Sequence, residues 1–394
     1  MSLFAALVAL LCLPTLAWAA EPTWLVGTSS GVTAARAVPG ERIAPGVRVV
    51  RGDAFTARRL RSLPGVRFVE PNRRFRASSI AAPSDPLFGR QWALRSTRAL
   101  RTWTATLGDG VPVAVLDSGL DLSNPDLAGN VWTNDDVPGN GLDDDGNGFV
   151  DDVHGADTVG WDGDPSDGLG HGTAVASIIA ARGDNGFGLS GMAWNAQVMP
   201  VKVLHDDGWG TTATMVAGLR YALDEGARIV NMSLNGSGRS QALDEAIQQA
   251  EARGVLVVTS AGNDGRNRDR VPSYPASERS QSVITVASAD RAGALAPGSA
   301  FGRASVDIAA PGDEILTSDL GGRFARRSGT SFAAAYVTGA AALLAAAHPD
   351  ASATRLRAAL IASSRRGGRV DARVAGGELD AAAALRRLGR LRPG

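Results

Sequence analysis

Ser331 is a candidate nucleophile, because its neighbouring residues are of types that could support catalysis. It lies in SGTSFAAAYVTGAAALLAAA, Ser328 to Ala347, where a small polar cluster precedes an alanine-rich stretch with the composition of a helix. Taken alone, Ser331 is best interpreted as a helix cap, because a hydroxyl at that position satisfies a free backbone N–H group. A nucleophilic role requires a base, a carboxylate that orients the base, and donors for a developing oxyanion.

His171 is the best candidate for the base. It stands between glycines in GLGHGTAVAS, which leave room for the imidazole to move. Asp117 ends a predicted buried strand and can hold one imidazole nitrogen, leaving the other to accept the proton of Ser331. The alternative for Asp117 is a structural pair with an arginine. The remaining histidines are more simply interpreted as structural or solvated side chains: His154, His205 and His348.

Two features could stabilise an oxyanion near Ser331. The helix that begins there presents its N-terminal amides and the positive end of its dipole. Asn263, in the segment AGNDG, can donate a side-chain N–H from the opposite side. Without Ser331 and His171, Asn263 would be interpreted as an ordinary turn residue, because the composition of that segment is typical of a turn.

Alternating strands and helices must position these side chains. Nearly continuous apolar segments at 111–116, 197–204, 227–233 and 255–262 alternate with helical patterns that begin near residues 173, 211 and 241. This pattern predicts a doubly wound α/β domain, with a mostly parallel sheet and helices on both faces. In such sheets the ligand site lies beyond the carboxyl ends of the strands, where Asp117, Ser233 to Gly236, and Ser260 to Asn263 follow their strands.

The N-terminus resembles a secretory signal. Residues 1–19 form an apolar run that ends in Ala17-Trp18-Ala19, a small-x-small cleavage pattern, so we expect a secreted protein, extracellular or periplasmic. An N-terminal anchor is the alternative, because the run lacks Lys and Arg. The single cysteine, Cys12, lies inside this segment, so we expect a mature chain without thiol or disulfide, and no later segment is predicted to span a membrane.

Charge is divided between two parts of the chain. Residues 1–84 carry 11 Arg and 4 acidic residues, a balance of +7, which leaves −7 for the remainder of a chain with zero net charge. Short strand patterns in VRVVRGDAF and VRFVEPN around a helical pattern in ARRLRSL predict a small α+β domain at 20–84. From the charge balance we predict that it binds the larger domain at 85–394, and that there is no nucleic-acid partner. The alternative is that the arginines merely solvate a small domain.

The sequence resembles the subtilases, the subtilisin-like serine peptidases. The blocks VAVLDSGLDLSNPDLAGN, GHGTAVASIIAA, NMSLNGSG, TSAGNDG and SGTSFAAAYVTGAAALL occur in the family's order and spacing, and DPLFGRQWAL and VKVLHDDGWGT resemble thermitase-like members. The resemblance implies a triad of Asp117, His171 and Ser331 with Asn263 as an oxyanion donor. It also implies two edge segments that bind an extended peptide or protein substrate, and a P1 pocket for a medium or large apolar side chain. The implied substrate-binding residues are Gly208, Gly210, Ser233, Leu234, Asn235, Gly236, Ala261, Gly262 and Ser273.

Some positions depart from the family. Phe332 and Ala335 replace the usual Met and Pro after the serine, and Ala174 replaces a second histidine, so we expect altered packing. The segment LPGVRFVEPN, Leu63 to Asn72, resembles the family's inhibitory propeptide. This implies a monomeric zymogen, inhibited by its own propeptide until cleavage near Ala77 to Ser84.

Acidic loops predict bound calcium. Asp143, Asp145, Asn147 and Asp151 alternate in GNGLDDDGNGFVDDVHGAD, and such hard oxygen ligands suit Ca²⁺; a solvated acidic loop is the alternative. A second candidate site contains Asp157, Asp162 and Asp164. A third, implied by the resemblance to thermitase-like members, contains Asp85, Asp126 and Asn185.

The sequence therefore predicts a secreted serine endopeptidase made as a zymogen. A catalytically silent, peptide-binding domain of the same family is the alternative. A lipase of another fold is disfavoured, because G-x-S-x-G is incomplete at Gly329-Thr330-Ser331-Phe332-Ala333.

Overall fold

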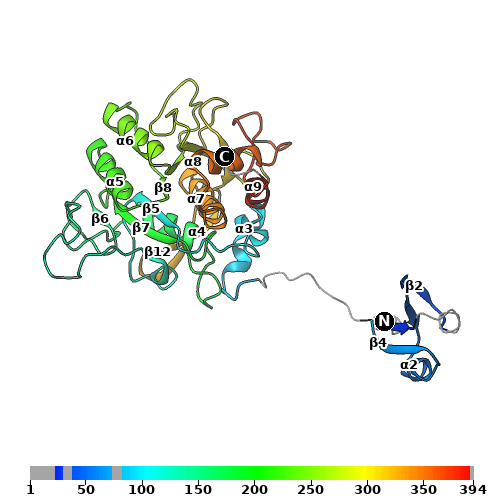
Figure 1. Cartoon of the computed structure of the whole chain (residues 1–394). Coiled ribbons are helices and arrows are strands. Elements are labelled where there is room, and N and C mark those ends of the chain that lie inside the picture. Colours follow the sequence, from blue (N-terminus) through cyan, green and yellow to red (C-terminus); the bar gives the residue numbers. More distant parts are fainter. Residues whose placement is uncertain (1–22, 30–37, 73–81, 391–394) are drawn as a thin grey trace, which may run out of the picture. The chain divides into compact units, whose positions relative to one another are not determined.

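The computed structural model describes residues 23–29, 38–72 and 82–390. The chain divides near residue 78 into two compact units (Figure 1). The predicted signal at 1–19, with Cys12, lies outside the described residues, and so does most of the predicted cleavage region. Each unit is described separately below.

The N-terminal unit is a small α+β fold. Its four antiparallel strands lie in the order β2-β3-β1-β4, and Val26, Val50, Leu60 and Val69 form its core. The helix begins after Asp53, whose Oδ1 accepts the backbone N–H of Thr56 at 2.8 Å. This agrees with the predicted fold, although β1 and β2 were not foreseen. The elements are β1 (Thr23–Thr28), β2 (Glu41–Ala44), β3 (Val47–Arg51), α2 (Ala54–Arg61) and β4 (Val66–Pro71).

The large unit is built on a seven-stranded parallel sheet. Its strand order is β11-β10-β9-β8-β5-β7-β6, and each neighbouring pair is parallel. Chain order reverses beside β5, which lies between β7 and β8. The strands are β5 (Pro112–Asp117), β6 (Ala156–Asp157), β7 (Gln197–Lys202), β8 (Ile229–Met232), β9 (Leu256–Ser260), β10 (Val283–Ala289) and β11 (Ile308–Pro311).

Helices cover both faces of this sheet, as predicted. On β5, Val113 and Val115 point into one apolar core and Ala114 and Leu116 into another, as the two-residue period of a strand requires. The first core contains α3 (Trp92–Ser96), α4 (His171–Ala180), α7 (Thr330–Ala347), α8 (Ala353–Ala362) and α9 (Ala381–Leu388), and the second contains α5 (Thr212–Asp224) and α6 (Gln241–Ala252). Four short 3₁₀ helices lie at Phe88–Arg90, Ala99–Arg101, Ala128–Asn130 and Leu320–Gly322, the last inside a hairpin of β12 (Ile315–Asp319) and β13 (Arg323–Arg327).

Helix α7 runs through the middle of the first core (Figure 1). It is apolar and long enough to cross a membrane by length and composition, but nearly all of it is buried inside the fold. A Cβ at Gly339 would lie 2.5 Å from the Cβ of Met192, so this helix approaches its neighbours very closely. The alanines of α7 therefore serve the close packing of a buried helix.

Candidate active site

Asp117 and His171 are brought together at the carboxyl end of β5. Asp117 is the last residue of β5, His171 is the first residue of α4, and the Nδ1 of His171 lies 2.7 Å from the Oδ1 of Asp117. Asp117 is fully buried, whereas the His171 side chain is 25% exposed. The carboxylate thus holds one imidazole nitrogen and leaves the other available, which is the arrangement that the sequence predicted.

Three charged residues influence the pKa of His171. Burial lowers this pKa, but the charge of Asp117 and its hydrogen bond outweigh burial, and the pKa lies above its usual value. Arg327 acts in the opposite direction and lowers the pKa, while Asp167 raises it. The imidazolium is therefore stabilised by the carboxylate that also orients the ring.

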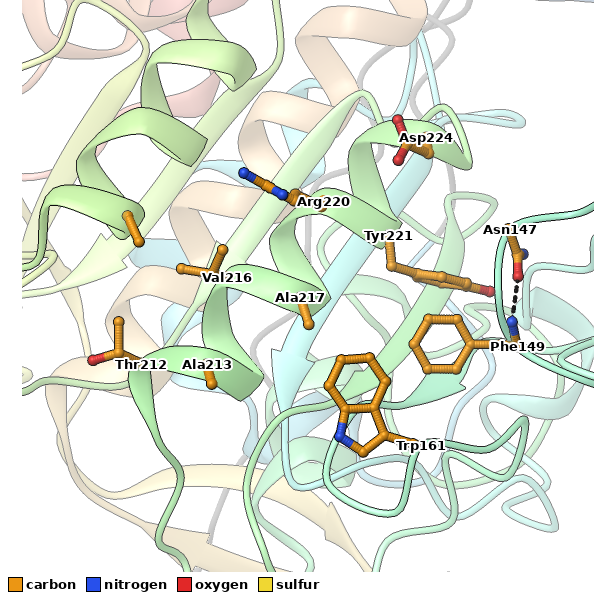
Figure 2. Close-up of a pocket in the computed structure, with 11 residues that line it drawn as sticks. Asn147, Phe149, Trp161, Thr212, Ala213, Val216, Ala217, Arg220, Tyr221 and Asp224 are labelled. Carbon is orange, nitrogen blue, oxygen red and sulfur yellow. Dashed lines mark hydrogen bonds between the residues drawn. The ribbon is translucent and has the colours of Figure 1, made fainter.

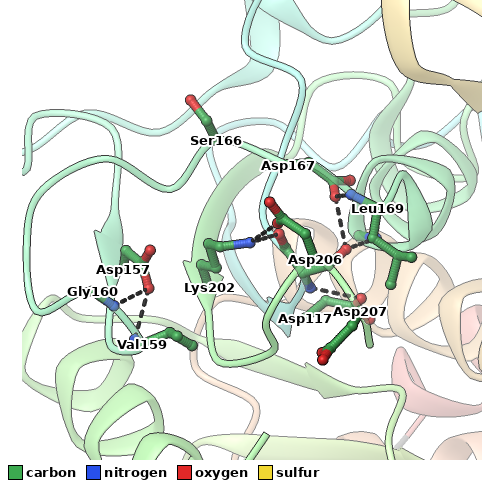
Figure 3. A network of polar contacts seen from close by, with 12 residues as sticks. Asp117, Asp157, Val159, Gly160, Ser166, Asp167, Leu169, Lys202, Asp206 and Asp207 are labelled. Carbon is green, nitrogen blue, oxygen red and sulfur yellow. Dashed lines mark hydrogen bonds and ion pairs between the residues drawn. The ribbon is translucent and has the colours of Figure 1, made fainter. Parts of the chain in front are cut away.

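Asp167 organises the loop before His171, and sequence reasoning missed it. Its Oδ1 accepts the hydroxyl of Ser118 and the backbone N–H of Gly170, both at 2.8 Å. It also accepts the backbone N–H of Leu169 at 3.0 Å (Figure 3). Its Oδ2 accepts the hydroxyl of Thr173 at 2.7 Å. Burial raises the pKa of Asp167, but these hydrogen bonds, led by those from Thr173, lower it overall. Asp167 stays ionised and fixes the chain on both sides of His171.

Lys202 lies next to Asp117 in the sheet. The two residues are register partners on β7 and β5, and the Nζ of Lys202 donates to the carbonyl of Ser118 at 2.9 Å and to Asp206 at 2.6 Å (Figure 3). The ammonium group therefore holds the strand end that carries Asp117.

Ser331 is the second residue of α7. Gly329 occupies the N-cap position of this helix. Ser331 therefore lies inside the first turn and does not act as the cap. Its Oγ donates to the carbonyl of Ser233 at 3.2 Å, and the hydroxyl of Ser233 donates to the carbonyl of Ser331 at 3.1 Å. The Phe332 ring centroid lies 5.7 Å from that of His171, so the residue after the serine packs against the imidazole. Phe332, the unusual residue at that position, is buried in this contact.

Asn263 lies against the start of α7. Its Oδ1 accepts the backbone N–H of Thr330 at 2.9 Å and the Thr330 hydroxyl at 3.0 Å. Because the side-chain oxygen is used in this way, the Nδ2 of Asn263 points away from Thr330 and is available as a donor. The hydroxyl of Thr330 also accepts the backbone N–H of Gly262 at 3.0 Å. Sequence reasoning did not identify Thr330, although it directly precedes Ser331.

The segments predicted to bind substrate lie at the same edge of the sheet. Gly236 and Tyr274 form an antiparallel bridge, with N–H to O distances of 2.7 and 2.8 Å between their backbones. Ser273 donates to the carbonyl of Gly236 at 3.0 Å, and Asn235 donates to Ser260 at 2.8 Å. Residues 233–236, 260–262 and 273 are thereby joined. The turn at Gly208 to Gly210 lies in the loop that follows β7, and its Trp209 is 76% exposed.

The acidic insertion gathers three carboxylates. One oxygen from each of Asp136, Asp143 and Asp145 lies within 4.8 Å of the other two. Asp136 is buried and had not been predicted. Asp151 is used differently, because its oxygens accept the backbone N–H groups of Asn140 and Gly141, both at 3.0 Å. Burial and the charges of Asp136 and Asp143 raise the pKa of Asp145, so this loop concentrates negative charge.

Asn147 connects this loop to α5. Its Nδ2 donates to Asp145, Asp152 and Glu225, each at 3.0 Å. A groove of about 600 Å³ lies beside it, lined by Phe149, Trp161 and the outer face of α5 (Figure 2). Asn147 is the one predicted site residue that lines this groove, which is therefore distinct from the site around His171.

Asp85, Asp126 and Asn185 meet in a second acidic site. Asn185 donates its side-chain N–H to Asp126 at 3.2 Å and its backbone N–H to Asp85 at 3.0 Å. Burial, with a contribution from the charge of Asp85, raises the pKa of Asp126 to about 6. Neither carboxylate forms an ion pair with a basic residue in the described ranges 23–29, 38–72 and 82–390. Asp85 and Asp126 are buried carboxylates of the kind that Ca²⁺ prefers, whereas the Oδ1 of Asn185 accepts the backbone N–H of Phe187 at 2.8 Å in this structure.

The second predicted set, that of Asp157, Asp162 and Asp164, forms a chain of turns. Asp157 accepts the N–H groups of Val159 and Gly160, and Asp162 accepts the N–H of Asp164 at 3.0 Å. Among the described residues, the only group of three or more acidic, His or Cys side chains with ligand-like spacing is that of Asp136, Asp143 and Asp145.

Comparison with known proteins identifies the family of this chain. Residues 108–380 match the subtilase family model, so the chain belongs to the subtilase family and is a subtilisin-like serine endopeptidase that acts on protein or peptide substrates. It is 35% identical over 279 residues to thermitase from Thermoactinomyces vulgaris, covering 71% of this chain and 90% of that protein. It is 34% identical over 251 residues to subtilisin DY from Bacillus licheniformis, covering 64% and 82%.

Solved structures show the same fold. Proteases from Pseudoalteromonas arctica PAMC 21717 superpose with a TM-score of 0.67 at 29% identity, covering 78% of this chain and all of that one. The predicted resemblance to thermitase-like subtilases and the predicted α/β fold are thus confirmed.

Proposed function

We propose that Asp117, His171 and Ser331 form the catalytic triad and that Asn263 donates to the oxyanion. The 2.7 Å contact between Asp117 and His171, at the sheet edge where the first turn of α7 carries Ser331, carries this proposal. His171 accepts the proton of Ser331 through its free nitrogen while the hydroxyl oxygen attacks the scissile carbonyl, and later protonates the leaving amine. Water then attacks the acyl-enzyme while His171 accepts its proton, and His171 passes this proton to the Oγ of Ser331 as the acyl–oxygen bond breaks and the carboxylic acid product leaves.

The surroundings of Ser331 suit this step. Its Oγ donates to the carbonyl of Ser233 in this structure, and it exchanges this bond for one to His171 when substrate is attacked. The Nδ2 of Asn263 and the backbone N–H of Ser331 would donate to the oxyanion, since the N–H of Thr330 is already bonded to Asn263. Removal of one such donor typically lowers kcat by about 10²–10³-fold.

Casein hydrolysis tests this assignment. The wild-type chain and the Ser331→Ala variant would be compared at equal concentration, after circular dichroism has shown that both are folded. We expect loss of nearly all activity in the variant. Equal activity of the two proteins would exclude Ser331 as the nucleophile, and an inactive wild type would favour the silent, peptide-binding alternative.

Extended substrate would bind along two backbone segments, 208–210 and 233–235, by strand addition. The backbone of Gly236 is already paired with Tyr274 and would support the second segment. Ala261, Gly262 and Ser273 would line the P1 pocket. The bridge between Gly236 and Tyr274 supports this proposal, because it fixes one wall of that pocket. Because these small, uncharged residues would leave room for a medium or large apolar P1 side chain, peptide p-nitroanilides with P1 Phe or Leu should have a higher kcat/KM than those with P1 Asp.

Residues 20–84 would act as an inhibitory propeptide after removal of a signal at 1–19. Two features of this part support the proposal. It carries a balance of +7 against −7 for the rest, and its unit exposes Ile43, Phe55 and Phe68 to solvent. After removal of the signal, the Ser331→Ala variant should accumulate outside the cytoplasm with its propeptide still attached. The wild-type protein should be cut near Ala77 to Ser84. Mass spectrometry of the secreted protein measures both.

Calcium would bind to the two acidic sites. Asp85, Asp126 and Asn185 would hold one ion, and Asp143 and Asp145, joined by Asp136, would hold another. A bound ion would offset the charge repulsion in each site and stabilise the folded chain by mass action. Isothermal titration of the chelated Ser331→Ala variant with Ca²⁺ tests this; absence of any binding heat and of any shift in Tm would exclude it.

A further inference from the structure

Arg268 is a buried cation that the proposed mechanism leaves without a role. Its side chain is 3% exposed, although arginine is rarely buried unless it is fully paired. It follows Asn263 by five residues, in the sequence NDGRNR. Its own backbone N–H donates to the carbonyl of Phe301 at 2.7 Å, which anchors the base of the side chain.

The guanidinium group of Arg268 spans the segment that carries Asn263. Its Nε donates to the carbonyl of Ala261 at 2.7 Å, two residues before Asn263. Its Nη2 and Nη1 donate to the carboxylate of Asp264, one residue after Asn263, at 2.7 and 3.2 Å. Nη1 also lies 3.3 Å from the carbonyl of Val271. One rigid, planar group thus holds the chain on both sides of Asn263.

The guanidinium of Arg268 requires a glycine at position 262. Its φ is +105°, and a Cβ at this position would lie 2.3 Å from the Nη2 of Arg268. The guanidinium therefore occupies the space directly behind the residue that precedes Asn263, and only glycine leaves that space free.

We propose that Arg268 is a positioning residue that fixes Asn263 for stabilisation of the oxyanion; this rests on the proposed role of Asn263. Thr330 holds the side-chain oxygen of Asn263, and Arg268 holds the two neighbouring positions, through the carbonyl of Ala261 and the carboxylate of Asp264. The donor must lie at the place where the oxyanion forms, and a displacement of about 1 Å can cost about 10²-fold in rate. Arg268 touches neither substrate nor reacting atoms, and acts on the transition state through Asn263.

The test compares Arg268→Gln with Arg266→Gln, a matched control. Arg266 is 64% exposed and approaches the same Asp264 only at 3.9 Å, so its loss should leave activity unchanged. With a peptide p-nitroanilide, Arg268→Gln should lower kcat about 10- to 10²-fold, with KM within about 3-fold of wild type. The inhibition constant of a peptide boronate, which mimics the tetrahedral state, should rise by the same factor as kcat/KM falls.

A double mutant separates this role from a general loss of structure. In an Asn263→Ala background, Arg268→Gln should lower kcat by less than about 3-fold further, because the donor that it positions is gone. An equal loss in both backgrounds would overturn the proposal, and so would a wild-type kcat in Arg268→Gln. Should Asn263→Ala itself keep a wild-type kcat, the oxyanion assignment fails and this inference fails with it. If Arg268→Gln does not fold, Asp264→Asn replaces it, with a several-fold loss of kcat expected and the same non-additivity.

Discussion

Replacing Thr330 by valine removes one hydroxyl from the start of α7 without changing the shape of the side chain. Thr330 is fully buried, and its Oγ1 accepts from the N–H of Gly262 and donates to the Oδ1 of Asn263, both at 3.0 Å. In Thr330→Val the N–H of Gly262 becomes a buried donor without a partner, which costs about 1–3 kcal/mol of the free energy of unfolding. Asn263 keeps one bond to Thr330, through the backbone N–H at 2.9 Å.

The loss of activity should therefore be partial. Complete removal of an oxyanion donor costs about 10²–10³-fold in kcat, and here the donor is retained but less firmly held. We expect Thr330→Val to lower kcat about 10-fold with little change in KM. Stability would be measured by denaturant unfolding in a Ser331→Ala background, which prevents self-digestion, and kcat with a peptide p-nitroanilide in the active enzyme.

Thr330→Ser is the control, because it keeps the hydroxyl and loses the methyl group. It should keep a kcat close to that of wild type and lose about 1 kcal/mol of stability through the missing methyl. If serine lowered kcat as much as valine does, or if valine kept both wild-type kcat and stability, the hydrogen-bond reasoning would be refuted.

Three further perturbations have definite expected outcomes. Arg327→Ala removes a charge that lowers the pKa of His171, so this pKa should rise and the acid limb of the kcat/KM profile should move to higher pH. Arg326→Ala, at an exposed position, should leave the acid limb in place. Movement of the limb to lower pH in Arg327→Ala would contradict the argument. Chelation of calcium should accelerate heat inactivation of the processed enzyme, measured as residual activity, and unchanged inactivation would count against both calcium sites. Gly172→Ala should yield no folded enzyme by circular dichroism, because its Cβ would lie 2.1 Å from the carbonyl of Gly119; Gly238→Ala, with nothing within 4 Å, should behave as wild type.

The sequence predicted the parts of the site that lie at the ends of buried strands. Asp117 and Asn263 follow apolar runs that could only be inner strands of a parallel sheet, and parallel strands bring such residues to one edge. His171 could be selected among the histidines because glycines surround it. Continuous apolar runs, the residues that follow them and the flanking glycines were the signals for these positions.

The supporting residues could not be predicted in this way. Asp167, Thr330 and Arg268 act through hydrogen bonds whose partners are fixed by tertiary packing, and their local sequences resemble ordinary turns. The acidic insertion illustrates the same limit. Alternation along the chain placed Asp151 with Asp143, but Asp151 has a φ of +54° and turns towards two backbone amides, while Asp136 joins the cluster from outside the alternating run.

Covalent labelling tests the central claim most directly, because it identifies the nucleophile itself. The processed enzyme would be treated with a fluorophosphonate, and its tryptic peptides would be mapped by mass spectrometry. We predict one adduct per chain, on Ser331, with loss of activity in proportion to labelling, and no adduct on Ser331→Ala. An adduct on another serine, or full activity in a chain labelled at Ser331, would contradict the account.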